Sequence, residues 1–304
     1  MRNALMQALT KLARNDRNIM LLTADLGFSV FEEFEYEFPD QFLNVGVSEQ
    51  NMTGVAAGLA LEGKKVFTYS IGIFPTLRCL EQIRNDICYH KLNVNIIGMG
   101  GGLSYGALGM SHHATEDLGV LRSIPQISIL APCSKNETFV LINETINLPG
   151  PSYIRLDKTS IEENNSVTLG KVNLISQGND VLIIGIGGVL KECNLAREKF
   201  LEKGLSTTVL SAHTLKPFDE NGFLKHCDGK KAIVSIEEAS SFGGLSSAIS
   251  EVICKYQIST PFKGISLGDT FISTVGDQTF LKEQYGISSE NIVNTVNELL
   301  NISV

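Results

Sequence analysis

Buried apolar runs alternate along the chain with segments whose apolar residues recur at helical spacing. In the first half, runs typical of parallel strands occupy residues 18–25, 64–70, 92–100 and 126–132. Helical spacing marks the segments between them, residues 50–62, 76–90 and 116–123. Continuous apolar strands that alternate with helices are typical of a parallel sheet covered on both faces. The pattern therefore predicts a doubly wound α/β fold.

A second alternation of the same kind follows a polar break rich in Ser, Asn and Glu. Its expected strands are residues 179–187, 206–213 and 230–238, and its expected helices are residues 189–203, 243–256 and 289–301. Because the break lies near the middle of the chain, we expect two doubly wound domains. Their predicted bounds are residues 1–160 and 171–304, joined by a linker over residues 161–170.

Composition narrows the class of protein. The 304 residues, 43% of them apolar and 19% charged, have the composition of a globular protein. A net charge of -8 argues against nucleic acid or an anionic membrane as the main partner. No apolar run is long enough to cross a bilayer, and the N-terminal segment lacks the apolar block of a signal peptide. The six cysteines include no CxxC pair, which favours reduced thiols in a cytoplasmic enzyme.

Two polar features stand out beside stretches of small residues: a single glutamate and a pair of histidines. Glu49 opens a stretch rich in Gly and Ala; taken alone, it is explained as a helix N-terminal acid stabilised by the helix dipole. His112 and His113 follow the glycine-rich segment 98–109, and a loop histidine suits acid–base chemistry, although a structural role stays open. Neither this segment nor residues 185–189 fits a phosphate-binding motif, and a tight strand-to-helix turn explains the second.

Four segments together resemble the transketolase family: TADLGFS, NVGVSEQNMTGVAAGLALEG, MSHHATEDLGVLRSIPQISILAPCSKNE and PSYIRLDK. The chain is similar to the C-terminal half of transketolase and of deoxyxylulose-phosphate synthase over essentially its whole length. This resemblance implies a pyrimidine-binding thiamine diphosphate fold with a parallel sheet, then a transketolase C-terminal-like domain with a mixed sheet. The GDG motif with which the family binds metal and diphosphate is missing. We therefore expect thiamine diphosphate and Mg²⁺ to be bound jointly with an N-terminal, diphosphate-binding subunit that supplies the metal ligands, as an α2β2 assembly.

The resemblance also assigns roles to individual residues. Glu49 would hydrogen-bond the aminopyrimidine of the cofactor and favour its reactive tautomer. Phe74, with Tyr69 as its rival, would stack on the same ring. His112 would contact substrate oxygens and assist proton transfer. The remaining positions lie near the cofactor or where the family binds a sugar phosphate, and they are Asp25, Arg2, Ser29 and Lys158.

Three departures from the family pattern bear on the substrate. Leu108 stands where transketolase has an Asp that contacts a substrate hydroxyl, and Gly100 replaces a phosphate-contacting histidine. Lys158 replaces an Arg, and lysine binds phosphate as a point charge and not as a fork. Sites that hydrogen-bond a hydroxyl discriminate strongly against analogues that lack it. The usual pentose phosphates are therefore in doubt as substrates.

The resemblance implies the C-terminal subunit of a split transketolase, which transfers a two-carbon ketol unit from a ketose or ketose phosphate to an aldose. Two alternatives stay open: a subunit that decarboxylates a 2-oxo acid, and a catalytically silent regulatory partner. The sequence does not name the sugars, the pathway or the partner. Glu237, Glu238 and His213 lie at strand ends in the second domain, where we expect loop packing or contact with a neighbouring subunit.

Overall fold

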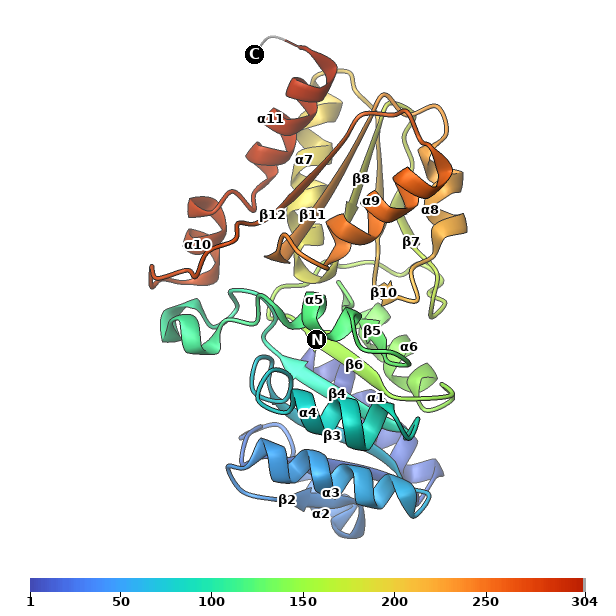
Figure 1. Cartoon of the computed structure of the whole chain (residues 1–304), viewed down its shortest axis with the longest axis vertical. Helices are drawn as coiled ribbons and strands as arrows, with labels where there is room; N and C mark the ends of the chain where they lie inside the picture. Colours follow the sequence, from blue (N-terminus) through green and yellow to red (C-terminus); the bar gives the residue numbers. More distant parts are fainter. Residues whose placement is uncertain (303–304) are drawn as a thin grey trace.

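The computed structural model describes residues 1–302, which form two sheets stacked one above the other in Figure 1. The first sheet has seven strands in the order β10-β5-β6-β4-β3-β1-β2. Its strands are β1 (Ile19–Thr23), β2 (Phe42–Asn44), β3 (Lys65–Ile71), β4 (Val94–Met99), β5 (Ser128–Leu130), β6 (Ser152–Leu156) and β10 (Thr214–Lys216). All neighbours are parallel except β10, which runs antiparallel to β5 and comes from the second half of the chain.

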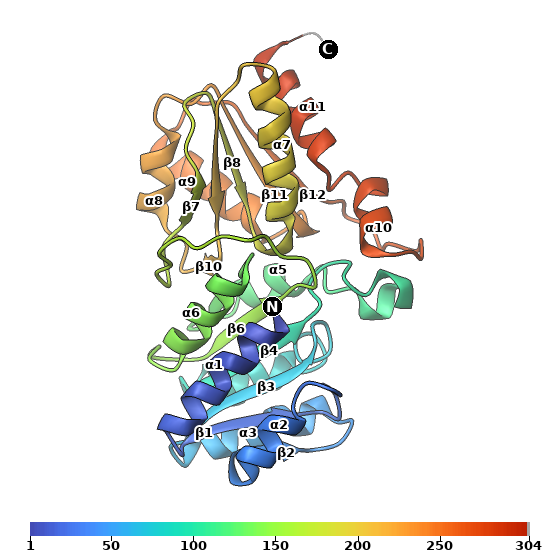
Figure 2. The ribbon, with the colours of Figure 1, turned by 180° about the vertical axis from the view of Figure 1, so that it is seen from behind.

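Helices cover both faces of the first sheet. Figure 2 shows α1 (Arg2–Asn15) and α6 (Lys135–Thr145) on one face, whereas Figure 1 shows α3 (Glu49–Leu61) and α4 (Leu80–Gln82) on the other. Short helices α2 (Glu32–Glu37) and α5 (Asp117–Arg122) complete this half. The α1 sequence buries residues at helical spacing, including Leu5, Leu9 and Leu12. Every residue of β1 is buried, as expected for a central strand covered on both faces.

The second sheet has five strands in the order β12-β11-β8-β9-β7. Its strands are β7 (Asn173–Ser176), β8 (Val181–Gly185), β9 (Thr207–Ser211), β11 (Ala232–Ser240) and β12 (Phe262–Leu267). The edge strand β7 is antiparallel, so this sheet is mixed. Its helices are α7 (Leu190–Glu202), α8 (Glu220–Cys227), α9 (Leu245–Tyr256), α10 (Gln278–Gln284) and α11 (Ser289–Leu300). Figures 1 and 2 show α8 and α9 on one face of the sheet and α7 and α11 on the other.

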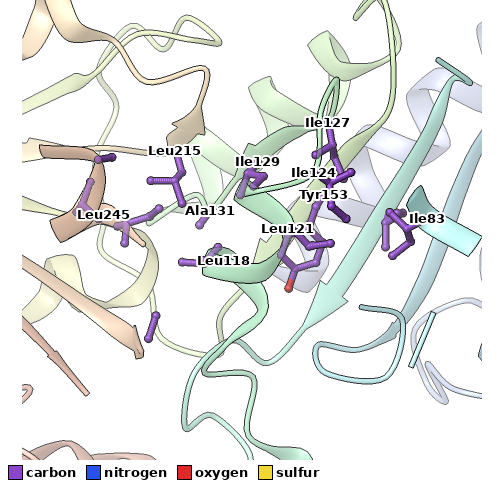
Figure 3. Packing of buried hydrophobic residues seen from close by; sticks show 14 of the residues in the cluster. Ile83, Leu118, Leu121, Ile124, Ile127, Ile129, Ala131, Tyr153, Leu215 and Leu245 are labelled. Carbon is purple, nitrogen blue, oxygen red and sulfur yellow. The ribbon is translucent and has the colours of Figure 1, made fainter. Parts of the chain in front are cut away.

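One apolar cluster extends from the first sheet to the second. It contains buried residues beside both sheets, such as Ile129 of β5 and Ile184 of β8. Leu118 of α5, Leu215 of β10 and Leu245 of α9 lie in the same cluster, as Figure 3 shows. Because an apolar core excludes water between the two sheets, polar groups buried there must find partners within the protein.

The predicted α/β class, with one mainly parallel and one mixed sheet, is confirmed. Each segment predicted as a strand contains one, but residues 76–90 form the short α4 and a π-helical turn (Ile83–Cys88) in place of one helix. The elements missed include β6, whose buried Arg155 interrupts the apolar pattern, and the three-residue β2 and β10. All six cysteines are free thiols, five of them buried. Among residues 1–302, no helix has both the length and the apolar character required to span a bilayer.

Candidate active site

Most of the residues assigned to the site follow the carboxyl ends of neighbouring strands. Asp25 lies just after β1, Glu49 after β2 and Phe74 after β3, while the segment with His112 follows β4. These four strands are adjacent in the order β4-β3-β1-β2. Ligands of open α/β sheets bind at the carboxyl ends of the strands, so the topology gathers these residues at one edge.

Glu49 is the first residue of α3 and only 2% exposed. Its Oε2 lies 2.7 Å from Nη1 of Arg78, and its Oε1 accepts a hydrogen bond of 3.3 Å from the hydroxyl of Ser70. A buried carboxylate is costly unless it is paired, and Arg78 is the partner that its burial demands. Sequence reasoning missed Arg78 and Ser70; the one signal was their position beside Phe74, in the segment that follows the α3 helix.

The structure brings Phe74, Arg78 and His112 together next to Glu49. The Arg78 guanidinium carbon lies 4.5 Å from the centroid of the Phe74 ring, a cation–π contact. The His112 ring meets Phe74 edge to face, with 5.2 Å between the centroids. His112 is half-buried and its Nδ1 lies 3.1 Å from the Ser111 hydroxyl. A carboxylate, an aromatic face and an imidazole therefore lie within one small region.

Tyr69 belongs to the core instead. It is 4% exposed and packs edge to face against Phe31, with 4.8 Å between the ring centroids. Burial raises the pKa of Tyr69 to about 12. Phe74 is only partly buried, so it is the better placed of the two aromatic side chains to receive a flat ring. His113, unlike its neighbour His112, is buried; its two ring nitrogens lack a hydrogen-bond partner, and burial lowers its pKa.

The segment after β1 is held in a strained conformation. Asp25 and Ser29 have left-handed backbones, with φ of 55° and 59°. Asn44 holds Asp25 twice: its Oδ1 accepts from the Asp25 N–H and its Nδ2 donates to the Asp25 carboxylate, both at 3.0 Å. Glu32 accepts the N–H of Ser29 at 2.6 Å. Strain of this kind persists where the surroundings fix it and is frequent at functional sites.

Cationic side chains gather beyond His112. Lys158 Nζ lies 3.8 Å from the centroid of the Tyr105 ring. Burial and the nearby positive charge of Arg2 lower the pKa of Lys158. Two cations that repel each other favour an anion between them. Arg2 and Ser29 also line a cleft of about 910 Å³ between α1 and the segment before α2.

Glycine is needed in the segment after β4 because the surrounding side chains occupy the space that a Cβ would fill. A Cβ at Gly100, whose φ is +82°, would overlap the ring of Tyr105. A Cβ at Gly101 would overlap Arg155, and one at Gly102 would lie 2.6 Å from Glu238 Cγ. Any side chain at Gly100, including the histidine that the family resemblance implies for this position, would require Tyr105 to move. The second cluster, Gly185 to Val189, is the expected strand-to-helix turn between β8 and α7.

Glu237, Glu238 and His213 are buried more deeply than loop packing at a surface requires. Glu238 contacts the glycine-rich segment of the first half, and Glu237 accepts hydrogen bonds from the first turn of α9. His213 precedes β10, and its Nδ1 lies 3.0 Å from the Thr214 hydroxyl. The three residues thus lie inside the chain, near the junction between the two sheets.

Comparison with known proteins matches two family models to the chain. The model described as "Transketolase, pyrimidine binding domain" matches residues 1–163, and "Transketolase, C-terminal domain" matches residues 170–292. The chain is 34% identical to an apulose-4-phosphate transketolase subunit from Phocaeicola vulgatus, over 98% of this chain and 97% of that protein. It is also 34% identical to the 6-deoxy-6-sulfo-D-fructose transketolase subunit from a Clostridium species, over 98% of this chain and 94% of that protein.

The chain is also similar to a longer synthase and to a protein of solved structure. The 1-deoxy-D-xylulose-5-phosphate synthase of Heliobacterium modesticaldum is 29% identical over 96% of the chain, which spans 46% of that longer protein. A solved split-gene transketolase, described as an inactive β4 tetramer, has a TM-score of 0.88 and 31% identity. That likeness covers 100% of this chain and 98% of the solved one.

Proposed function

This chain belongs to the transketolase family, and from that premise we propose that it is the C-terminal subunit of a split, thiamine diphosphate-dependent transketolase. In this proposal the assembled enzyme transfers a two-carbon ketol unit from a ketose, or ketose phosphate, to an aldose. The observation that carries it is the buried Glu49 beside the half-buried Phe74, at the strand ends where His112 also lies. We retain the division into residues 1–160 and 171–304 as part of the proposal.

The residues present fit the aminopyrimidine of thiamine diphosphate. A buried acid suits a ring nitrogen, and a partly buried aromatic face suits a flat ring. We assign Glu49 to the pyrimidine nitrogen, where it holds a shared proton, and Phe74 to the ring face, with Asp25 close to the cofactor. Bound at these residues, the cofactor would supply nucleophilic carbon chemistry toward a ketose carbonyl. Arg78, paired with Glu49 at 2.7 Å, balances the charge of that acid.

The substrate side of the site is assigned to His112 and three phosphate-binding residues. We assign His112 to the hydroxyl and carbonyl oxygens of the sugar, where an imidazole moves protons near neutral pH. Arg2, Ser29 and Lys158 are assigned to a sugar phosphate, supported by the lowered pKa of Lys158 beside Arg2. Leu108 is 56% exposed and offers no hydrogen bond to a substrate hydroxyl. We therefore infer a substrate other than the usual pentose phosphates, in line with the unusual sugars named for the two split relatives.

The chain needs a second subunit in this proposal. The relatives of similar length are named as subunits, and the solved β4 neighbour is described as inactive. The metal and diphosphate ligands are assigned to a partner chain that carries the GDG motif, in an α2β2 assembly. Gly54 and Gly58 on α3 leave open space where a Cβ would lie, so a partner helix can approach closely.

A subunit that decarboxylates a 2-oxo acid is the second candidate. It is supported by the 29% identity to 1-deoxy-D-xylulose-5-phosphate synthase, which extends over almost the whole of this chain. The glycine-rich segment with Leu108, and the higher identity to the split transketolase subunits, favour ketol transfer.

The test is a calorimetric titration of thiamine diphosphate with Mg²⁺. The titrant is added to this chain, to a candidate GDG-containing partner, and to their mixture. We expect binding only in the mixture, followed by ketol transfer between sugar phosphates. Tight binding to this chain alone would contradict the assignment of the diphosphate site to the partner. Release of CO₂ from pyruvate, without ketol transfer, would favour the second candidate.

Glu49→Gln is the matched variant for this test, with the exposed Glu62→Gln as its control. Gln preserves the shape of the side chain but cannot share a proton in the same way. Because acid–base groups contribute about 10²- to 10⁴-fold to rates, we expect Glu49→Gln to lower turnover by at least about 100-fold. Turnover within about twofold of that of Glu62→Gln would refute the assigned role of Glu49 and the mechanism built on it.

A further inference from the structure

Glu238 connects the second sheet to the glycine-rich segment of the first half. It lies near the end of β11 and is 3% exposed. Its Oε1 accepts a hydrogen bond of 2.5 Å from the backbone N–H of Leu103. Gln278, at the start of α10, donates to both carboxylate oxygens at 3.0 and 3.1 Å and lies 3.2 Å from the Ser104 hydroxyl. The Glu238 carboxylate and the Gln278 amide thus hold residues 103 and 104.

Glu238 packs directly against the glycine-rich segment. Gly102 has a φ of +56°, and a Cβ there would lie 2.6 to 2.7 Å from the Glu238 side chain. Farther along, a Cβ at Gly106 would overlap Leu281 of α10. Figure 1 shows the segment between β4 and α5 extending beneath α10. The loop over residues 100–113 is therefore held at two points by the second half of the chain.

We propose that Glu238, together with Gln278, is a positioning residue of the active site. It does not touch the substrate; it holds the loop that carries Tyr105 and His112, and so sets the distance between His112 and Phe74. This inference rests on the proposed function and deepens it, because it gives the second half of the chain a part in sugar binding. The hydrogen bond to Leu103 is charge-assisted and buried, which makes it stronger than a neutral one.

Glu237, the preceding residue, provides a matched control. It is fully buried on the same strand, but its side chain points to the other face of the sheet. Its carboxylate accepts the N–H groups of Leu245 and Ser246, at 2.7 and 2.8 Å, in the first turn of α9. Loss of either carboxylate removes a buried acid from β11, but only Glu238 contacts the loop over residues 100–113.

The hold on the loop is expected to depend on pH. Burial, and then the negative charge of Asp157, raise the pKa of Glu238 to about 7, whereas Lys282 and Arg155 oppose that shift. Residues 100 to 111 of the loop carry no charge. The ionised carboxylate accepts from Leu103 and Gln278 at once. Below pH 7 it gains a proton, loses acceptor capacity and holds the loop less tightly.

The first experiment is hydrogen exchange, followed by mass spectrometry, on the full chain without cofactor or partner. Loss of a charge-assisted bond permits at least about tenfold more opening. At pH 8 we expect Glu238→Ala to speed exchange over residues 102–112 by at least about tenfold. Glu238→Gln, which keeps one acceptor oxygen but no charge, should restore only part of the protection. Glu237→Ala should affect residues 243–250 and leave the loop unchanged. In the wild type, loop protection corrected for intrinsic rates should fall between pH 8 and pH 6, but not in Glu238→Gln.

The second experiment measures KM and kcat of the assembled enzyme. We expect Glu238→Ala to raise the KM for the sugar at least about tenfold, while the cofactor Kd stays within about twofold of the wild-type value. Equal loop exchange in Glu238→Ala and wild type would overturn the inference. An unchanged sugar KM despite faster loop exchange would overturn it too. If the assembly shows no ketol transfer, the proposed function fails, and the exchange data still decide whether Glu238 holds the loop.

Discussion

Arg155 provides the sharpest test of how the two halves are held together. It is the next-to-last residue of β6, and its side chain is only 4% exposed. Its Nη1 lies 3.2 Å from Oδ1 of the fully buried Asp117, and its Nη2 donates to the backbone oxygen of Glu238 at 2.6 Å. Its Nε is 3.9 Å from Asp157. One guanidinium therefore links β6, α5 and β11.

We predict that Arg155→Met lowers the free energy of unfolding by about 3 to 5 kcal/mol at pH 8. Methionine fills most of the volume, so the cost comes from buried charge and not from a cavity. The variant leaves Asp117 and Asp157 without their cation and the Glu238 carbonyl without a donor. Removal of one partner from a buried ion pair typically costs about 3 to 5 kcal/mol, a large share of the roughly 5 to 15 kcal/mol that stabilises a typical domain.

Urea denaturation at pH 8 and pH 5 measures this loss of stability and the direction in which it changes with pH. Burial raises the pKa of Asp117, and the charge of Arg155 opposes that rise. Without Arg155 the folded-state pKa rises further, so the folded variant holds a proton that the unfolded chain has released. Stability of the variant then increases as the pH falls, and its deficit at pH 5 should be smaller than at pH 8. A loss below about 1 kcal/mol at pH 8, or equal losses at both pH values, would refute the reasoning.

Three further predictions concern the cofactor face, the α3 surface and the buried Asp117. Phe74→Ala should weaken thiamine diphosphate binding to the assembled enzyme by about 10- to 100-fold, as expected for a lost stacking partner, whereas Tyr69→Phe should change the calorimetric Kd less than twofold. Gly58→Ala should stabilise the isolated chain by up to about 1 kcal/mol in urea, because alanine favours helix, yet weaken assembly with the partner in sedimentation; unchanged assembly would remove α3 from the proposed interface. Tyr153→Phe should cost about 1 to 3 kcal/mol, because the Asp117 carboxylate loses a buried hydrogen bond of 2.6 Å; a neutral effect in urea would show that Asp117 finds another donor.

Local patterns along the chain were enough to predict the class of fold and the segments that carry the candidate site residues. Long apolar strands such as β3, β4 and β8 and amphipathic helices such as α11 carry their own periodicity, so local pattern was enough to predict them. The motif around Glu49 and the resemblance to the transketolase family assigned the acid, the aromatic and the histidine to segments that follow expected strands. The parallel order of those strands then brings these residues to one edge.

Contacts between side chains that are far apart in the sequence follow from the packing of the folded chain. Arg78 as the partner of Glu49, and Glu238 as the partner of Leu103, join residues 29 and 135 positions apart, and no local pattern encodes such a pairing. The glycine-rich segment stood out in the sequence, but nothing in its pattern indicated that Tyr105, Arg155 and Glu238 pack against Gly100, Gly101 and Gly102. β10 contributes to the first sheet through its pairing with β5, although it lies among elements of the second. Because buried charges must be paired wherever the apolar core closes around them, Glu49 finds its partner among the elements of the first half, whereas Glu238 meets Leu103 only where the two halves pack together.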